Sequence, residues 1–322
     1  MKAPARMIVP PTTDRALGTA LGLLADRLLA DPPDRWHPVA WFGSAMGRVE
    51  AAIHADARLP GAVYALTGAG LGTAAGIVVG ALGVPGVALA VATASAGTTL
   101  RAAASRVEQH LLLDDLGAAR DLLPWLVGRD PSGLDAHGVS AAVVESLAEN
   151  TVDAVVAPAL WGLALGAPGV LLHRAANTMD AMVGHRSPRH RRFGTVAARL
   201  DDALAWVPAR AFAGLVALHA LPAGRARPVL DTVLRDAPAH PSPNAGVAES
   251  AVAAALGVEL GGPLRYGQRV EERPRLGEGP RPGTDDIVRA RHLVDRVELT
   301  LVGGALALWW ATRSRAHARS TP

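Results

Sequence analysis

The stretch GAVYALTGAGLGTAAGIVVGALGVPGVALAVATASAGTTL, residues 61–100, contains no Asp, Glu, Lys or Arg. A single helix of this length, at about 1.5 Å per residue, would be about twice as long as a bilayer core is thick. We therefore predict two membrane helices, 61–82 and 86–100, separated at GVPG, where Pro85 and its flanking glycines interrupt helical structure. The many small residues suit close helix packing in lipid. A buried soluble hairpin is the alternative, but soluble helices normally carry a charged face.

The composition excludes several kinds of chemistry. Half of the 322 residues are hydrophobic and only 19% are charged, and there is no cysteine, so disulfides and thiolate sites are ruled out. Lys2 is the only lysine, which leaves no lysine nucleophile or phosphate-loop lysine in the rest of the chain. The net charge is +3, with basic and acidic residues mixed along most of the chain, and the basic stretch lacks interleaved aromatics, so we expect no nucleic-acid partner.

Other apolar segments are shorter or interrupted by charges. They lie at 16–29, 154–175, 203–222 and 297–312. Short segments fit partial, re-entrant or interfacial helices as well as full spans. A signal peptide is the alternative for 16–29, but no convincing cleavage site follows, so we predict a retained helix.

The segments between the apolar stretches, 101–150 and 223–296, are expected to be soluble, and the second is rich in Pro, Gly and Arg. Neither alternates apolar and polar residues, as exposed strands do. The predicted fold is all-α. We expect one membrane-embedded domain over 1–322, polytopic, with re-entrant or interfacial helices and a Pro/Gly-rich loop region.

Two nearly identical phrases flank the apolar segment 154–175. They are ENTVDAVVAP at 149–158 and ANTMDAMVGH at 176–185. One straight helix would place Asp153 and Asp180 about 40 Å apart, on opposite sides of a membrane. LGAPG at 165–169 carries two glycines and Pro168, which favours a break. We therefore predict a re-entrant hairpin whose arms of about 12 residues bring the two phrases together.

Acidic residues lead into the first phrase. Glu145, Glu149 and Asp153 are spaced i, i+4 and i+8, so a helix places them on one side. Such a stripe is either simply solvated or, beside a membrane and facing other polar motifs, a site for Mg²⁺ or a cationic substrate group. In the second phrase, Asn177 and Asp180 share a helix face.

The densest basic cluster follows the second phrase, in HRSPRHRRFG. Its arginines are Arg186, Arg189, Arg191 and Arg192. They can mark a cytoplasmic loop, bind an anion through their guanidinium forks, or do both. Further on, Asp202, Trp206 and Arg210 share a face, and Arg210 needs a partner such as Asp202 or Asp201, in a structural pair or a substrate contact.

Five ordered motifs together resemble the CobD/CbiB family, the cobinamide-phosphate synthases of cobalamin biosynthesis. They are DRLLADPPDRWHPVAWFG (26–43), ENTVDAVVAP, NTMDAMVGH, FGTVAARLDDALAWVPAR (193–210) and SPNAGVAESAVAAALGVELGGPLRYG (242–267). The resemblance implies a multi-pass enzyme of the inner (cytoplasmic) membrane, with its active site on the cytoplasmic side. It also implies ATP-dependent, Mg²⁺-assisted amide formation between adenosylcobyric acid, a corrinoid, and (R)-1-amino-2-propanol or its O-phosphate.

Roles for individual residues follow as hypotheses from this implied reaction. Glu145, Glu149, Asp153 and Asp180 are expected to act in catalysis as Mg²⁺ ligands, because acids hold phosphates only through a metal. His37 or one of the carboxylates would accept the proton of the ammonium. The expected substrate-binding residues are Asn150, Asn177, Arg186, Arg189, Arg192, Arg199, Asp202, Arg210, Ser242 and Asn244. Expected partners are the two substrates, membrane lipid, and either a second copy of the chain or other corrinoid-pathway enzymes.

Two other functions remain open from the residues alone. A membrane sensor of the related AmpE-like type would keep the membrane helices but should lose the Asn and acid motifs, which are intact here. A transporter would place polar residues at the bilayer midplane, whereas here they cluster at the ends of the apolar segments.

Overall fold

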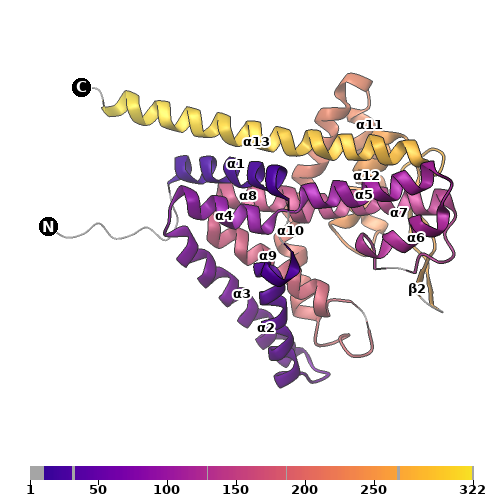
Figure 1. Ribbon diagram of the computed structural model, residues 1–322, viewed down its shortest axis with the longest axis horizontal. Helices are drawn as coiled ribbons and strands as arrows, with labels where there is room; N and C mark the ends of the chain where they lie inside the picture. Colours follow the sequence, from indigo (N-terminus) through magenta and orange to yellow (C-terminus); the bar gives the residue numbers. More distant parts are fainter. Residues whose placement is uncertain (1–10, 31–32, 129, 186, 267–268, 321–322) are drawn as a thin grey trace. The chain divides into compact units, whose positions relative to one another are not determined.

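The computed structural model describes residues 11–30, 33–128, 130–185, 187–266 and 269–320, and these are overwhelmingly helical (Figure 1). The all-α prediction is confirmed. The chain forms two compact units, which we describe separately. Unit 1 comprises Met1–Ala96, Asp153–Ala205 and Thr300–Pro322, and unit 2 comprises Gly97–Val152 and Trp206–Leu299.

Unit 1 is a helical assembly built around the predicted hairpins. Its elements are α1 (Thr12–Leu29), η1 (Asp34–Trp36), α2 (Pro38–Ile53), α3 (Arg58–Gly80), α4 (Val84–Ala94), η3 (Val152–Val156, from Asp153 on), α8 (Ala157–Leu165), α9 (Ala167–Val183), the first part of α10 (Thr195–Ala220) and the last part of α13 (Thr284–Ser320). Helix α3 packs on α9, and α1 packs on both α4 and α8 (Figure 1).

The break predicted at GVPG is confirmed. Helix α3 ends at Gly80 and α4 begins at Val84, with Pro85 in its first turn. Gly83 between them has a φ of +68°, a conformation that costs glycine little and other residues much. The proline is harmless at this position because the first N–H groups of a helix have no intrahelical acceptor.

Glycines let the helices of unit 1 approach closely. On α3, a Cβ at Gly72 would lie 2.6 Å from the carbonyl oxygen of Leu171 and 2.7 Å from Cβ of Ala175, both on α9. On α1, a Cβ at Gly18 would likewise come too close to the side chain of Val87 on α4. The small residues of 61–100 thus do what their composition predicted, which is to bring helix backbones together.

Replacing Gly72 with Val should destabilise unit 1 by about 1–3 kcal/mol, because the new side chain must push α3 away from α9. The measurement is thermal unfolding of the purified protein in detergent. Gly70→Val is the matched control, since a Cβ at Gly70 of the same helix has no neighbour within 4 Å. Equal melting temperatures for the two variants would contradict this packing.

Three stretches are long and apolar enough to cross a membrane, namely Arg58–Gly80, Val84–Leu112 and Thr195–Ala223. The first covers residues 61–80 of the predicted segment 61–82, and the other two include the predicted segments 86–100 and 203–222. The second continues to Leu112, so residues 101–112, which we expected to be soluble, belong to a candidate span. Segments 16–29, 154–175 and 297–312 are helical but, among the described residues, do not meet the length and hydropathy of a span.

Unit 2 combines short helices with the only strands among the described residues. Its elements are α5 (Gly97–Leu112), α6 (Leu116–Leu122), η2 (Leu123–Trp125), α7 (Ala136–Thr151), the second part of α10, η4 (Leu221–Ala223), α11 (Ala226–Asp236), η5 (Ala237–Ala239), α12 (Ala245–Leu256), β1 (Leu260–Gly261), β2 (Leu264–Tyr266), β3 (Arg269–Glu271), β4 (Arg275–Leu276) and the first part of α13. β1 pairs antiparallel with β4, with Leu260 opposite Leu276, and β2 pairs with β3. These strands were not expected, because runs of two or three residues are too short to show alternation.

Asp236 at the end of α11 fastens the β4 segment. Its carboxylate accepts hydrogen bonds from the Gly277 N–H at 2.8 Å and from Arg235 at 2.7 Å. Burial on its own would raise the pKa of Asp236, but these bonds outweigh burial and leave the pKa below its usual value.

The charged Asp236 should therefore stabilise the fold at neutral pH. This stabilisation is lost as the pH falls below about 4, through the lowered pKa of the carboxyl. We expect Asp236→Asn to melt at a lower temperature than wild type at pH 7, with a difference that shrinks toward pH 3. Melting curves of both proteins across this range are the measurement. A difference that grows on acidification would contradict the assignment.

Candidate active site

The two repeated phrases lie together. Helix α8 ends at Leu165, Gly166 has a φ of +68°, and α9 begins at Ala167 and packs back on α8. The side-chain amide of Asn177 in the second phrase donates a hydrogen bond to Oδ2 of Asp153 in the first, at 3.0 Å. The hairpin prediction is thus confirmed as a fold, since a straight helix would separate these residues by about 35 Å.

Asp153 lies in a local distortion of the helix. Residues Val152–Val156 form a single π-helical turn, η3, in a position where regular α-helix would be expected. The wider π-turn is costly, and such turns occur frequently at functional sites. The turn carries the half-buried Asp153 to the contact with Asn177.

Helix α10 brings two more carboxylates to this place. Asp201 interacts electrostatically with Asp153, Asp180 and Asp202, and it accepts a hydrogen bond from Asn177. Its Oδ1 atom is buried and has no hydrogen-bond partner among the described residues. Four carboxylates that repel one another, one with a buried oxygen that has no hydrogen-bond partner, form a donor set that a proton or a cation can neutralise. We call Asp153, Asn177, Asp180, Asp201 and Asp202 the acidic cluster.

Asp180 is held at the end of α9. Burial raises the pKa of its carboxyl to about 6, and the neighbouring charge of Asp202 adds to the effect. Its Oδ1 lies against the backbone of Gly184, occupying the space where a Cβ at that position would be. A glycine at 184 therefore lets the carboxylate adopt this position. On the preceding turn, Arg174 donates to Oδ1 of Asn177 at 3.3 Å and brings positive charge beside the acids.

The other predicted acids and Asn150 belong to unit 2. Glu145 is buried on α7, and its Oε1 accepts a hydrogen bond from the Gly261 N–H of β1 at 2.8 Å. Asn150 donates to the carbonyl and hydroxyl oxygens of Ser146, whereas Glu149 is exposed. Within unit 2, Glu145 therefore has a clear structural contact, and its role as a metal ligand stays a prediction.

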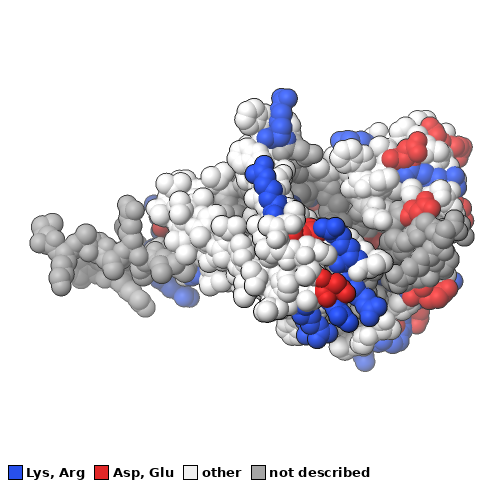
Figure 2. Space-filling view, turned by 90° about the horizontal axis from the view of Figure 1, so that it is seen from below, with Lys and Arg blue, Asp and Glu red and all other residues white. Residues whose placement is uncertain are grey.

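The predicted anion-binding arginines differ in their surroundings. Arg186 lies outside the described residues. Arg189 donates to Glu50 at 3.1 Å, whereas Arg192 and Arg199 are exposed. Figure 2 shows Lys and Arg together with Asp and Glu over parts of one face, next to broad areas without charged side chains. Arg189 is also exposed, so Arg192 and Arg199 differ from it in that no ion pair with a carboxylate is recorded for them within the described part of the chain.

A second polar group forms within unit 2. Arg210 of α10 donates to Oδ1 of the buried Asn244 at 2.8 Å and lies 4.4 Å from the ring centre of Trp206. The sequence suggested Asp202 or Asp201 as its partner, whereas the hydrogen-bonded side chain is that of Asn244. The hydroxyl oxygen of Ser242 accepts from the N–H of Ala245, the first residue of α12, at 3.1 Å. These contacts account for the positions of Asn244 and Ser242, and their substrate role stays a prediction.

His37 begins helix α2 as its N-cap. Its Nδ1 accepts a hydrogen bond from the Val39 N–H at 3.2 Å. A neutral imidazole that accepts at Nδ1 carries its proton on Nε2 and has no second acceptor nitrogen. In this arrangement His37 is a poor acceptor for the proton of an ammonium group.

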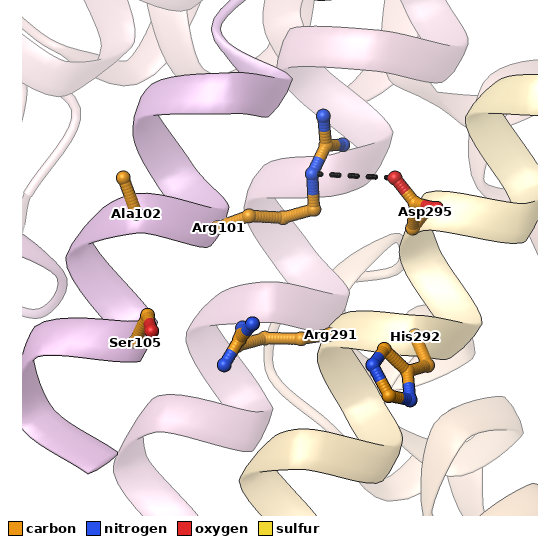
Figure 3. Close-up of a pocket in the computed structure, with 6 residues that line it drawn as sticks. All are labelled: Arg101, Ala102, Ser105, Arg291, His292 and Asp295. Carbon is orange, nitrogen blue, oxygen red and sulfur yellow. Dashed lines mark ion pairs between the residues drawn. The ribbon is translucent and has the colours of Figure 1, made fainter. Parts of the chain in front are cut away.

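One cavity of about 320 Å³ lies between α5 and α13 of unit 2 (Figure 3). Arg101, Arg291 and His292 line it, together with Ala102, Ser105 and Asp295. Arg101 pairs with Asp295 and Glu298, and Arg291 pairs with Glu108. Both arginines of this cavity are therefore paired with carboxylates.

Comparison with known proteins agrees with the motifs. The sequence model of the CobD/Cbib protein family matches residues 19–294. The chain belongs to the CobD/CbiB family. It is 45% identical to "Cobalamin biosynthesis protein CobD" of Mycobacterium tuberculosis strain H37Rv, over 86% of this chain and 90% of the relative. The proteins of the same name from Chromobacterium violaceum and Rhodobacter capsulatus are 41% and 40% identical, over 87% and 85% of this chain and 92% and 90% of theirs. No solved structure matches.

One residue of this CobD/CbiB acidic cluster, Asp201, and the neighbouring Arg174 were absent from the predicted site. Asp201 was considered only as a partner for Arg210, and Arg174 was not considered. Asp201 stands just before the long apolar run of α10, and Arg174 follows the apolar start of α9. A charged residue inside or beside such a run is a functional candidate. That signal was present in the sequence and would have found both residues.

Proposed function

We propose that the protein is a membrane-embedded amide synthase of cobalamin biosynthesis. It joins (R)-1-amino-2-propanol, or its O-phosphate, to adenosylcobyric acid with the use of ATP, in the cytoplasmic membrane with the site facing the cytoplasm. Family membership supports the pathway. The observation that supports the chemistry is the acidic cluster, in which the repeated phrases and α10 converge on one place.

The acidic cluster fits a divalent cation of the Mg²⁺ type. Its donors are carboxylate oxygens, which Mg²⁺ prefers, and the buried Oδ1 of Asp201 has no partner within the described part of the chain. Asp153, Asp180, Asp201 and Asp202 would hold the ion. When bound, Mg²⁺ supplies positive charge that offsets the negative charge of the ATP phosphates.

Asn177 and the neighbouring Arg174 orient the carboxylates of the cluster and supply positive charge beside them. Asn177 donates to both Asp153 and Asp201 and so holds two carboxylates in place. Arg174, bonded to Asn177, offers a positive charge to a phosphate at the edge of the cluster. Exposed arginines of the basic loop and of α10, Arg192 and Arg199, are suited to the phosphate of ATP or of aminopropanol phosphate.

The attacking amine must lose a proton before it can form the amide. Because His37 already accepts a backbone hydrogen bond at Nδ1, we assign the proton acceptor to a carboxylate of the acidic cluster. The amine nitrogen then attacks the carbonyl carbon of the activated corrinoid carboxylate, and the phosphate group of the activated acid leaves.

The test is a reconstituted reaction. Purified protein in nanodiscs is incubated with adenosylcobyric acid, aminopropanol phosphate, ATP and Mg²⁺, and the product is identified by mass spectrometry. We expect a product with the mass of the amide, dependent on both ATP and Mg²⁺. A parallel reaction with unphosphorylated aminopropanol identifies the preferred amine. No amide with either amine under any divalent metal would contradict the synthase and favour the sensor or transporter alternatives.

A further inference from the structure

A second cluster of ligating side chains lies in unit 1, formed by residues outside the acidic cluster. Glu50 and His54 stand at i and i+4 at the end of α2, and His190 comes from the loop that joins α9 to α10. One ligand atom from each lies within 4.8 Å of the other two, and all three side chains are half-buried. We call these residues the His-Glu cluster.

Each histidine of the cluster is oriented by a contact of one ring nitrogen. Nε2 of His54 lies 3.0 Å from the carbonyl oxygen of Arg189, which can only accept, so this nitrogen carries the proton and Nδ1 keeps its lone pair. Nδ1 of His190 lies 3.3 Å from the hydroxyl oxygen of Ser187, and its Nε2 faces Glu50. Metal-binding histidines typically donate their other N–H to a carbonyl or a similar acceptor.

The carboxylate of Glu50 is charged and oriented. Burial alone would raise the pKa of Glu50, but hydrogen bonds from His190 and Arg189 outweigh it and leave the pKa below its usual value. The exposed Arg189 side chain holds the carboxylate in place, with its Nη2 atom 3.0 Å from Oε1 of Glu50. Metal-binding carboxylates are commonly hydrogen-bonded in this way.

The separation of one ligand pair is close to that of a small transition-metal site, and the other separations are within 4.8 Å. Bonds of about 2.0–2.1 Å in a tetrahedral site place ligand atoms about 3.3 Å apart. Nε2 of His190 and Oε1 of Glu50 are 3.0 Å apart. Imidazole ligands favour Zn²⁺ and similar metals, whereas the all-oxygen donors of the acidic cluster favour Mg²⁺.

Packing around the His-Glu cluster holds its side chains in place. The ring of His54 packs on Phe193 with centroids 5.0 Å apart, and Phe193 is fully buried in a core with Tyr64 and Met179. The end of α2 and the loop are therefore both anchored next to the three ligands. A metal here would need only small side-chain movements to bind.

We propose that Glu50, His54 and His190 form a Zn²⁺-type site, with its fourth position open to water. The metal fastens the arginine-bearing loop to the end of α2. It replaces the His190–Glu50 hydrogen bond, and the proton between these groups is released on binding. The site is independent of the proposed amide synthesis and does not need the corrinoid, ATP or Mg²⁺.

The first test measures Zn²⁺ itself. Tag-free protein is stripped with chelator, dialysed against Zn²⁺ with excess Mg²⁺, and analysed for bound metal. We expect one tightly bound Zn²⁺ per wild-type chain and an affinity weaker by at least about tenfold in His54→Ala and His190→Ala. His110→Ala is the control, because the half-exposed His110 belongs to unit 2, lies beside Asp115 and is not one of the three ligands, and this variant should bind like wild type.

The second test uses wild-type protein alone, so that it does not depend on the variants folding. Co²⁺ in place of Zn²⁺ should give the intense visible absorption of a four-coordinate site, and Zn²⁺ should remove it. Zn²⁺ binding that is unchanged in His54→Ala and His190→Ala, or Co²⁺ that shows only weak six-coordinate absorption, would overturn the proposal. In that case the cluster is only an ion pair between Glu50, His190 and Arg189.

Discussion

Replacing Asp201 with Asn should lower the rate of amide formation by at least about a hundredfold, the scale expected for removal of a group that stabilises charge at an active site. The reason is specific to this residue. Asp201 interacts with the three other carboxylates of the acidic cluster, and its buried Oδ1 has no partner within the described structure. Asparagine keeps the shape of the side chain but removes the charge that a divalent cation needs. The measurement is the initial rate of amide formation at saturating Mg²⁺-ATP.

Asp153→Asn should have an effect of similar size, since Asp153 is held by the same amide of Asn177. Asp231→Asn is the control. Asp231 is exposed on α11 and makes only a surface ion pair with Arg227, which contributes little. Full activity in Asp201→Asn and Asp153→Asn, with both proteins folded, would remove the acidic cluster from the mechanism.

Gly184→Ala should reduce activity strongly while leaving the fold largely intact. A Cβ at this position would occupy the place of the Asp180 carboxylate oxygen. Gly184 has a φ of −74°, which alanine tolerates, and the largest overlap is with the flexible end of Asp180, although the carbonyl oxygen of Asp180, 2.8 Å from the new Cβ, must also shift slightly. We expect a loss of at least about tenfold in kcat, because a displaced carboxylate misplaces the groups it holds.

Gly70→Ala is the matched control for Gly184→Ala, because a Cβ there has no neighbour within 4 Å. Melting temperatures and initial rates of both variants are compared with wild type. Loss of activity in proportion to loss of folded protein would indicate a structural effect only. Wild-type activity in Gly184→Ala would show that the position of Asp180 does not matter for the reaction.

The helix breaks and the meeting of the two phrases followed from local chemistry. Pro85 with Gly83, and Pro168 with Gly166, interrupt helices wherever they occur, so the turns could be predicted without knowledge of the fold. Once the second turn was predicted, the meeting of the two phrases followed from arm length, whereas the bond between Asn177 and Asp153 is visible only in the structure.

Contacts that depend on packing between distant helices could not be predicted in this way. The rotation of α10 about its axis decides that Asp201 faces Asp153, and the fold of unit 2 decides that Arg210 reaches Asn244. The bond between Glu145 and Gly261 likewise depends on β1, a strand too short to leave a pattern. Such contacts are set by tertiary packing and not by the period of a single helix.

Binding of Mn²⁺ to the acidic cluster tests the central claim most directly. Mn²⁺ substitutes for Mg²⁺ at oxygen sites, and its electron paramagnetic resonance signal reports the free ion. In a titration of purified protein, we predict one Mn²⁺ that Mg²⁺ displaces in wild type and in His190→Ala, and loss of this site in Asp201→Asn. Mn²⁺ binding by Asp201→Asn that equals wild type, or binding lost only in His190→Ala, would contradict the account.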